Sequence, residues 1–378
     1  MPWMVRWAGG FPIFVTGGEG AHLTDVDGHR YLDLCLGDTG AMTGHAPAAP
    51  VEAVRAQAGR GFTFMLPTED AVWVGEELAR RFGLPYWQFA VTATDANRFA
   101  LRLAREITGR PKILVFNWCY HGTVDETFVT LREGRAVARD GNLGPPVDPA
   151  LTNVGIVHPE PGFHAALREL TRRAGTLLVI DETHTICTGP GGYTRAHGLD
   201  PDILTLGKPV AGGVPGAVYG FSEAVAERVR ARSRLDTADT GGIGGTLAAN
   251  ALATAAMRAT LEHVLTEASY RRTIPLAERF ARGVEGVIAE ESLPWIVKRL
   301  GCRVEYWFRP APPRNGGEAA AAVNPELERY MHLAALNRGI LLTPFHNMAL
   351  LAPAVTEADV DRHTEVFRES VRAGRLHR

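Results

Sequence analysis

The segment Leu204–Gly213 reads LTLGKPVAGG and places a lysine between a glycine and a proline. The only other lysines are Lys112 and Lys298, and every other basic residue is an arginine. An arginine guanidinium stays protonated, whereas a lysine amine can lose its proton and condense with a carbonyl group to form a Schiff base. Lys112 and Lys298 lie in segments that read as solvated surface. Lys208 is therefore the lysine with a candidate chemical role.

The sequence on either side of this lysine alternates short apolar runs with amphipathic stretches. This alternation predicts an α/β domain with a mostly parallel sheet. An Asp27-Gly28 turn joins two short strands near the N-terminus, and the C-terminal part reads as a smaller α+β domain. The predicted strands lie at 112–116, 176–181, 202–207, 216–221, 302–308 and 339–345, and the predicted helices lie at 68–82, 94–107, 161–175, 223–233 and 246–265.

Composition excludes several classes of protein. The chain has 378 residues and a net charge of −2, so no broad basic surface indicates a nucleic-acid partner. No apolar run approaches the roughly 20 residues that a membrane helix needs. The four cysteines form no CxxC pair, which is typical of free thiols in a reducing compartment. We expect a cytoplasmic protein with neither a membrane nor a nucleic-acid partner.

Polar residues follow three of the predicted strands. Asp181 closes one strand, Lys208 follows the next, and the segment Asn117–Gly122 follows a third. The carboxyl ends of parallel strands form the ligand-binding edge of an open sheet. Pyridoxal 5′-phosphate needs a lysine for its aldehyde, a carboxylate for its ring nitrogen and a flat contact for its ring. This combination predicts a pyridoxal-phosphate site.

An anion site is predicted at the start of the helix over 94–107. Thr92, Ala93 and Thr94 lie between a strand end and that helix. Unpaired backbone N–H groups and the helix dipole favour a phosphate there, and the two threonine hydroxyls can add hydrogen bonds.

Several motifs, taken in order, resemble the class III (omega) aminotransferases of fold type I, a family that includes glutamate-1-semialdehyde aminomutase. The motifs are GAHLTDVDGHRYLDL, GHAP, TATDAN, YHG, DETHT, PDILTLGKPVAGGVPGAVYG and GGTLAAN, spread over about residues 10–260. The resemblance implies a large pyridoxal-phosphate domain with a mostly parallel seven-stranded sheet over 38–262. It implies a small α+β domain over 263–378, which the segment 1–37 joins.

The resemblance also implies a role for each matched residue. Lys208 would form the internal aldimine and then carry the proton between substrate and cofactor, and Asp181 would pair with the pyridine nitrogen. The remaining cofactor-binding positions are Tyr120 and His121 at one ring face, Thr183 at the other, His184 near the ring hydroxyl, and Thr92, Ala93 and Thr94 at the phosphate. Thr246 resembles a threonine that reaches the phosphate of the neighbouring subunit, which implies a homodimer with shared active sites.

The chain departs from the family pattern at three of these positions. Ala93 stands where the family has a glycine, Thr183 where it has a valine, and His184 where many relatives have a glutamine. Backbone N–H donors survive the first change, so we expect phosphate binding to persist. A histidine can titrate near neutral pH, so the third change affects the electronic tuning of the ring.

The substrate is less well specified. Amino-acid transaminases hold the substrate carboxylate with an arginine, and Arg6 in PWMVRW resembles the arginine that does so in aminomutase-like relatives. Arg303 and Arg314 are weaker candidates. His346 and Asn347 stand where many omega-aminotransferases have a mobile arginine, which implies a different treatment of a second carboxylate.

Several functions remain open. The first is a ping-pong transaminase that moves an amino group from a β-amino acid, an ω-amino acid or an amine to a 2-oxo acid. The second is an intramolecular 2,1-aminomutase, against which LGDTGAMTGH lacks an expected aromatic residue. A racemase and a non-catalytic dimeric relative are further alternatives. A zinc site formed by Cys119, His184, Cys187 and His197 explains neither Lys208 nor the threonines, so we expect no metal.

Overall fold

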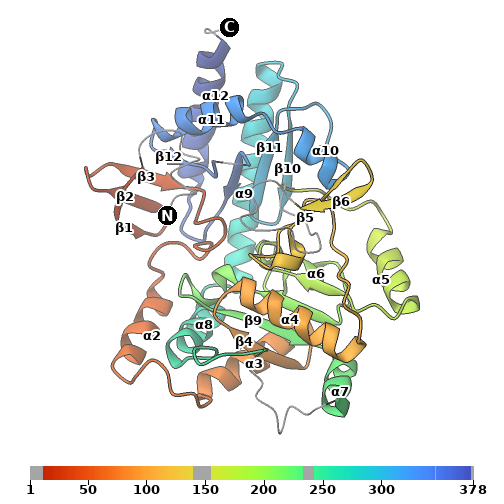
Figure 1. Cartoon of the computed structure of the whole chain (residues 1–378). Coiled ribbons are helices and arrows are strands. Elements are labelled where there is room, and N and C mark those ends of the chain that lie inside the picture. The colour runs from red at the N-terminus through yellow and green to blue at the C-terminus, as the bar shows by residue number, and fades with distance from the viewer. Residues whose placement is uncertain (1–11, 139–154, 233–241, 345, 376–378) are drawn as a thin grey trace. The chain divides into compact units, whose positions relative to one another are not determined.

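The computed structural model describes residues 12–138, 155–232, 242–344 and 346–375. The chain divides into two compact units, which Figure 1 shows with their element labels. Unit 1 comprises residues 1–47, 155–157 and 264–378, and unit 2 comprises residues 48–154 and 158–263. No helix of the described residues is long and apolar enough to cross a membrane.

The described residues of unit 1 form two small sheets. In the first, β1, β2 and β3 pair antiparallel and β12 joins β3 in parallel; in the second, β10, β11 and β13 are antiparallel. The predicted turn at Asp27-Gly28 is confirmed, because it joins β2 to β3. The elements are β1 (Val15–Glu19), β2 (His22–Asp25), β3 (Arg30–Asp33), α9 (Glu267–Glu290), β10 (Ile296–Leu300), β11 (Arg303–Trp307), α10 (Gly316–Ala321), α11 (Pro325–Leu336), β12 (Ile340–Leu341), β13 (Met348–Leu350) and α12 (Glu357–Arg375).

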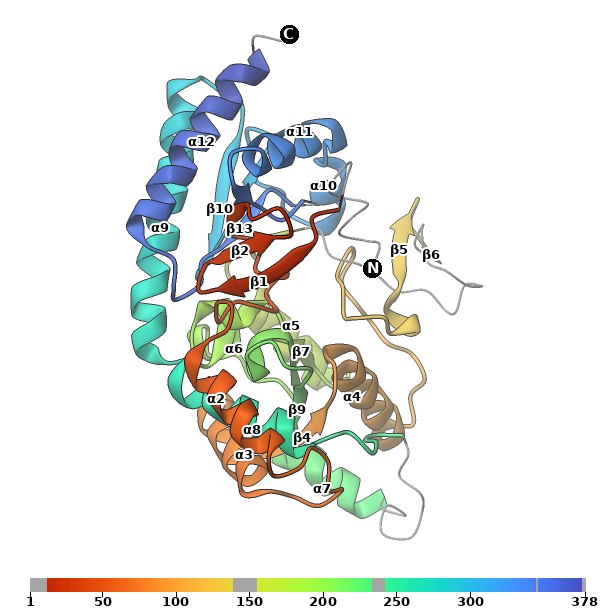
Figure 2. The same ribbon diagram turned by 90° about the vertical axis from the view of Figure 1, so that its left-hand side faces the viewer.

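The long helices α9 and α12 of unit 1 run side by side, as the two views in Figures 1 and 2 show. Helix α9 begins at an N-cap, Thr266, whose hydroxyl accepts a hydrogen bond from the Ser269 amide. Phe280 of α9 stacks on His363 of α12, with ring centroids 4.1 Å apart. Burial lowers the pKa of His363 to about 3, because no charge compensates for its desolvation.

Unit 2 is built around a sheet with the strand order β4-β9-β8-β7. Strands β7 and β8 are parallel, and the β8–β9 and β4–β9 pairs are antiparallel. Its elements are α2 (Ala48–Ala58), α3 (Glu69–Phe82), β4 (Tyr86–Ala90), α4 (Ala93–Thr108), η1 (Asp125–Thr127), β5 (Val129–Arg132), β6 (Arg135–Ala138), α5 (Phe163–Arg173), β7 (Val179–Asp181), η2 (Thr185–Thr188), α6 (Gly192–Ala196), β8 (Ile203–Leu206), η3 (Lys208–Ala211), β9 (Ala217–Phe221), α7 (Glu223–Arg232) and α8 (Ala251–His263).

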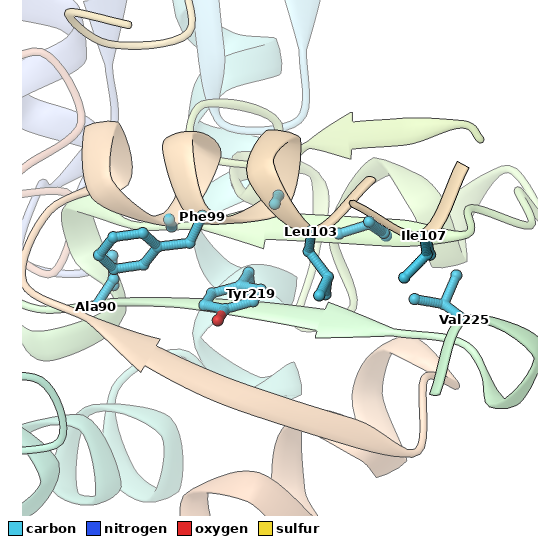
Figure 3. Close-up of a cluster of buried hydrophobic side chains, with 10 residues drawn as sticks. Ala90, Phe99, Leu103, Ile107, Tyr219 and Val225 are labelled. Carbon is cyan, nitrogen blue, oxygen red and sulfur yellow. The ribbon is translucent and has the colours of Figure 1, made fainter. Parts of the chain in front are cut away.

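Helix α4 packs on this sheet through its apolar stripe. Its residues Phe99, Leu103 and Ile107 contact Tyr219 of β9 and Val225 of α7, as Figure 3 shows. The Phe99 and Tyr219 rings have centroids 6.1 Å apart. The spacing of these residues is the helical periodicity seen in the sequence, and their burial fixes which face of α4 meets the sheet.

One strand prediction is wrong. Residues 112–116 are not part of a strand in the described structure, and two of their apolar side chains, Leu114 and Phe116, are 88% and 52% exposed. An apolar run becomes a strand only where a neighbouring strand supplies hydrogen bonds, and the described residues supply none here. The sheet of unit 2 therefore has four hydrogen-bonded strands and one parallel pair among the described residues, rather than the seven mostly parallel strands that the resemblance implies.

Candidate active site

Lys208 is the first residue of the short helix η3, and only Gly207 separates it from the end of β8. Its backbone has φ of +47°, a conformation that non-glycine residues adopt uncommonly. The side chain is half-buried, and its Nζ lies 2.8 Å from Nε2 of His184. A backbone outlier at a reactive residue is typical of functional sites, where the surrounding structure holds the strain.

Asp181 closes β7, and its register partner in β8 is Thr205, three residues before Lys208. The backbone N–H of Thr183 donates to Oδ1 at 3.0 Å. The other oxygen, Oδ2, lies 2.9 Å from Nδ2 of Asn97 and 3.0 Å from Nδ1 of His121. Both carboxylate oxygens are therefore hydrogen-bonded.

The protonation states of His121 and Asp181 depend on each other. Burial disfavours the charged form of each, but their mutual hydrogen bond and charge attraction outweigh it. The pKa of His121 rises to about 10, with a further contribution from Cys119. The pKa of Asp181 is held well below its usual range by His121 and Thr183. Asp181 is thus a carboxylate at neutral pH, as a partner for a cationic ring nitrogen must be.

The predicted phosphate site has the expected helix terminus. Thr92 is the N-cap of α4, and its hydroxyl accepts from the Asp95 amide at 3.1 Å while donating to the Asp95 carboxylate at 2.7 Å. A side chain at Gly207 would collide with the methyl group of Ala93. The glycine before Lys208 thus leaves room for the alanine that departs from the family pattern.

The loop that carries His121 is tied to the same helix terminus. The hydroxyl of Thr94 accepts a hydrogen bond from the Thr123 amide at 3.1 Å. Gly122 has φ of +76° and approaches Thr94 so closely that a Cβ at Gly122 would collide with it. This packing fixes the position of His121 relative to α4.

The other predicted cofactor contacts occupy different surroundings. Tyr120 is 40% exposed, and its ring lies 6.2 Å from that of Phe128. Thr183 is buried beside Asp181. Thr246 lines a cavity of about 290 Å³ beside the first turn of α4, and the other lining residues are Val91, Asp95, Phe99, Gly244, Gly245, Leu247 and Ala248.

The three arginines predicted as candidates for binding a substrate carboxylate differ in their surroundings. Arg6 lies outside the described residues. Arg303 is buried in unit 1 and donates to Thr39, and Arg314 is paired with Glu318 at 2.7 Å. Arg303 and Arg314 both have hydrogen-bond partners within unit 1, so their contacts do not single out either one as the residue that binds the substrate.

Two buried polar residues next to the site were not among the predicted site residues. Asn97 is buried in α4 and bridges the site, since it donates to Asp181 and to the His121 carbonyl, at 3.2 Å, and accepts from the Thr205 hydroxyl at 2.6 Å. Glu182 is also buried and accepts from the amide of Tyr193. Asn97 could have been recognised in the sequence as a polar amide on the apolar face of the predicted helix, where Ala96 and Ala100 also lie.

The zinc alternative finds no support in the geometry. Among the described residues, the only cluster of three or more potential metal-ligating side chains is Asp25, Asp27 and His29, in the β2–β3 hairpin of unit 1. None of the four residues that the zinc reading requires belongs to that cluster.

Comparison with known proteins identifies the family. The sequence profile of the family "Aminotransferase class-III" matches residues 4–140 and 146–371. The chain belongs to the class III aminotransferases. It is therefore a pyridoxal-phosphate-dependent enzyme with the α/β architecture of fold type I, as the motifs predicted.

Individual relatives of this class III protein include several aminomutases. It is 32% identical to a glutamate-1-semialdehyde 2,1-aminomutase of Chloroflexus aggregans over 411 residues, which cover 97% of this chain and 92% of the relative. It is 49% identical to a glutamate-1-semialdehyde aminomutase of Pseudomonas aeruginosa PAO1, with a TM-score of 0.94 over 98% of this chain and 90% of that chain. A lysine-to-alanine variant of that protein was crystallised in complex with PMP.

A β-phenylalanine aminotransferase of Variovorax paradoxus is also similar. It has 25% identity and a TM-score of 0.84, over 96% of this chain and 88% of that chain. Proteins similar to this chain are thus named for both intramolecular and intermolecular amino transfer.

Proposed function

We propose that this protein is a pyridoxal-phosphate-dependent 2,1-aminomutase, which moves an amino group between adjacent carbons of one substrate of the glutamate-1-semialdehyde class. The observation that carries the proposal is the 49% identity and TM-score of 0.94 with the Pseudomonas aminomutase. The Chloroflexus relative quoted above has the same activity in its name. This replaces the transaminase as the first choice, which the sequence alone had favoured.

The residues at the site fit the cofactor. Asp181 is an ionised carboxylate, and Lys208 is an amine near the adjacent strand end. The N-terminus of α4 offers backbone N–H groups and the hydroxyl of Thr94, while the hydroxyl of Thr92 donates to Asp95. Bound pyridoxal phosphate supplies an aldehyde and an electron sink that stabilises negative charge at the substrate carbon. We assign the ring nitrogen to Asp181, the aldehyde to Lys208 and the phosphate to the start of α4.

The chain's own residues supply the proton transfers. With the cofactor bound, the Lys208 amine would take a proton from one substrate carbon and return it at another position, acting as base and then as acid. Asp181 keeps a negative charge throughout, because His121, Asn97 and Thr183 donate to it. His121 and Asn97 therefore act through Asp181, as positioning residues.

Transamination between two substrates is the second candidate. The β-phenylalanine aminotransferase of V. paradoxus and an omega-transaminase of Sphaerobacter thermophilus, at 26% identity and a TM-score of 0.85, are the observations in its favour. The segment Leu36–His45 also lacks the aromatic residue that the resemblance led us to expect in an aminomutase. In either reaction we propose a homodimer in which Thr246 faces the partner's phosphate.

The two reactions differ in their need for a second substrate. The purified full chain is loaded with pyridoxal phosphate and given 4-amino-5-oxopentanoate (glutamate-1-semialdehyde) alone. Formation of the isomer 5-amino-4-oxopentanoate is followed by liquid chromatography against authentic standards, because the two compounds have the same mass. We expect turnover without any 2-oxo acid, and a loss of about a hundredfold or more in Lys208→Ala, because general acid–base catalysis contributes that much. Turnover of a β-amino acid that starts only when a 2-oxo acid is added would make the protein a transaminase instead.

A further inference from the structure

The contact between His184 and Lys208 is not explained by the roles assigned so far. The sequence resemblance places His184 near the ring hydroxyl of the cofactor, yet its Nε2 lies 2.8 Å from Nζ of Lys208. Both side chains are half-buried. The separation is that of a hydrogen bond between two nitrogens, so one must donate and the other must accept.

The backbone on both sides holds this contact in place. His184 lies three residues after Asp181, at the N-cap of the short helix η2, and Lys208 begins η3 with a left-handed backbone. Strands β7 and β8, which lead to the two residues, are paired in parallel with Asp181 beside Thr205. Gly207 packs against Ala93, and Pro209 is buried, so Lys208 has little freedom to move away.

Chemistry selects the direction of the hydrogen bond. A protonated lysine has three N–H donors and no acceptor, whereas a neutral imidazole can present an unprotonated Nε2. A hydrogen bond from a charged donor is stronger than one between neutral groups. The pair is therefore most stable when the proton is on Lys208 and His184 accepts.

We propose that His184 is a positioning residue that aims the Lys208 amine and stabilises its protonated form. When the C–H bond of the substrate breaks, the proton goes to Nζ of Lys208 and the electron pair stays with the substrate carbon. The new ammonium N–H donates to Nε2 of His184, which makes Lys208 a stronger base. When Lys208 returns the proton it becomes a neutral amine again. The inference rests on the proposed role of Lys208 in amino transfer, but the contact itself can be tested without turnover.

The test measures the proton affinity of the Lys208 amine directly. The full chain is loaded with PMP, which has an amine in place of the aldehyde and so leaves Lys208 unlinked. Trace acetylation with acetic anhydride, followed by peptide mass spectrometry over a range of pH, reports the neutral fraction of each lysine. Lys112 and Lys298 serve as internal references in the same molecule.

Four variants distinguish loss of the hydrogen-bond acceptor from a general effect of replacing a histidine. His184→Ala and His184→Asn remove the acceptor or withdraw it, and His184→Gln keeps an oxygen acceptor at a similar reach. His164→Gln removes a histidine of the same unit that contacts Tyr193 rather than the site. We expect Lys208 to be acetylated about tenfold faster, relative to Lys112, in the Ala and Asn variants near pH 8, since the lost hydrogen bond is charge-assisted. His184→Gln and His164→Gln should follow the wild type.

Superimposable Lys208 profiles in wild type and His184→Ala would overturn the inference, as would a His184→Gln profile that follows the Ala variant. If His184→Ala does not fold, His184→Asn carries the same comparison. The result is separate from the proposed function. A protein that lacks aminomutase activity can still show the shift, and an active one without the shift contradicts only the role of His184.

Discussion

At the scale of single residues, the site is organised around the carboxylate of Asp181. Its three donors come from three segments: Asn97 from α4, His121 from the loop that precedes η1, and Thr183 from the turn after β7. Asp181 and Lys208 could be predicted from the sequence, because residues at the carboxyl ends of parallel strands lie at the ligand-binding edge of the sheet. Asn97 was not predicted, because its role depends on which side chains the fold brings opposite one face of a helix.

Asn97 connects α4, β7 and β8, so its removal should weaken both fold and cofactor binding. In Asn97→Ala the hydroxyl of Thr205 and one oxygen of Asp181 each lose a partner. We expect a loss of about 1–3 kcal/mol in the free energy of unfolding, as for other buried groups left unsatisfied, and about tenfold weaker binding of pyridoxal phosphate. Urea unfolding and a fluorescence titration measure the two effects. Asn337→Ala, at an exposed position, is the matched control, and an Asn97→Ala protein equal to it would contradict the bridging role.

The His121–Asp181 pair predicts a pH dependence of stability. The pKa of His121 rises from 6.5 to about 10 on folding, so its contribution is complete below about pH 6.5 and is lost as pH rises toward 10. The pKa of Asp181 falls on folding, so its contribution is lost only when the pH drops below its ordinary value of 3.8. The stabilisation is thus greatest between these two ordinary pKa values.

The measurement compares wild type with His121→Gln, both free of cofactor. We expect the difference in the free energy of unfolding to be largest near pH 5.5 and to shrink steadily by pH 9.5, within the window set by the His121 shift. A difference that is constant or grows with pH would show that His121 is neutral in the folded protein.

At the scale of elements, the N-terminus of α4 is a junction between the sheet and two loops. Gly207 from the end of β8 packs against Ala93, and Gly122 packs against Thr94. The periodicity of 94–107 predicted this helix to within one residue at each end, because its apolar stripe covers the sheet. The packing of the loops on its first turn could not be predicted, since glycine indicates freedom of the backbone but not what comes close to it.

Gly122→Ala tests this junction. The added Cβ would collide with Thr94 at a backbone angle of +76°, so the loop that carries His121 must move away from α4. We expect a loss of more than about 1 kcal/mol in the free energy of unfolding, together with weaker binding of pyridoxal phosphate. Gly109→Ala is the control, because Gly109 has φ of +67° but no atom near its Cβ position. If both variants lose the same stability and bind the cofactor alike, backbone strain alone explains the effect.

A second element-scale contact ties residues 155–157 to β11 within unit 1. Glu305 is buried and accepts from the Ile156 amide at 2.7 Å. Burial raises its pKa to about 8, with opposing effects from Arg303 and Glu328. A raised carboxyl pKa means that stability is complete below its ordinary value of 4.5 and falls as pH rises through 8. We expect Glu305→Gln to match wild type near pH 5 and to exceed it in thermal stability near pH 9; equal melting temperatures at both would contradict this.

At the scale of the whole molecule, the sequence predicted the family and the α/β class but not the number of strands. The order of the motifs identifies the family because each motif supplies a different part of one cofactor site. The strand count was taken from the family resemblance and not from a pattern of strands in the sequence itself. The family match is interrupted between residues 140 and 146. The count of seven comes from the family, whereas among the described residues of unit 2 four strands pair in one sheet and the run 112–116 forms no ladder.

The surface of unit 2 predicts how the molecule assembles. Four exposed apolar residues lie in one loop, namely Phe62, Phe64, Met65 and Leu66, and Leu247 is exposed as well. The amide of Leu252 donates to the carbonyl of Phe62 at 3.4 Å, so this loop and the start of α8 are neighbours. Clustered apolar side chains of this kind mark an interaction surface. Because Thr246 adjoins Leu247, a second copy bound here would meet the residue assigned to the shared phosphate site.

We therefore expect the protein to be a dimer whose interface includes this loop. Met65→Asp combined with Leu66→Asp places two charges in the interface, so sedimentation should show a monomer, and pyridoxal phosphate should bind at least about tenfold more weakly. Val26→Asp, which alters another exposed apolar residue in the β2–β3 turn of unit 1, should leave the dimer intact. A wild type that sediments as a monomer with full activity would refute shared active sites. A double variant that stays dimeric would place the interface elsewhere on the molecule.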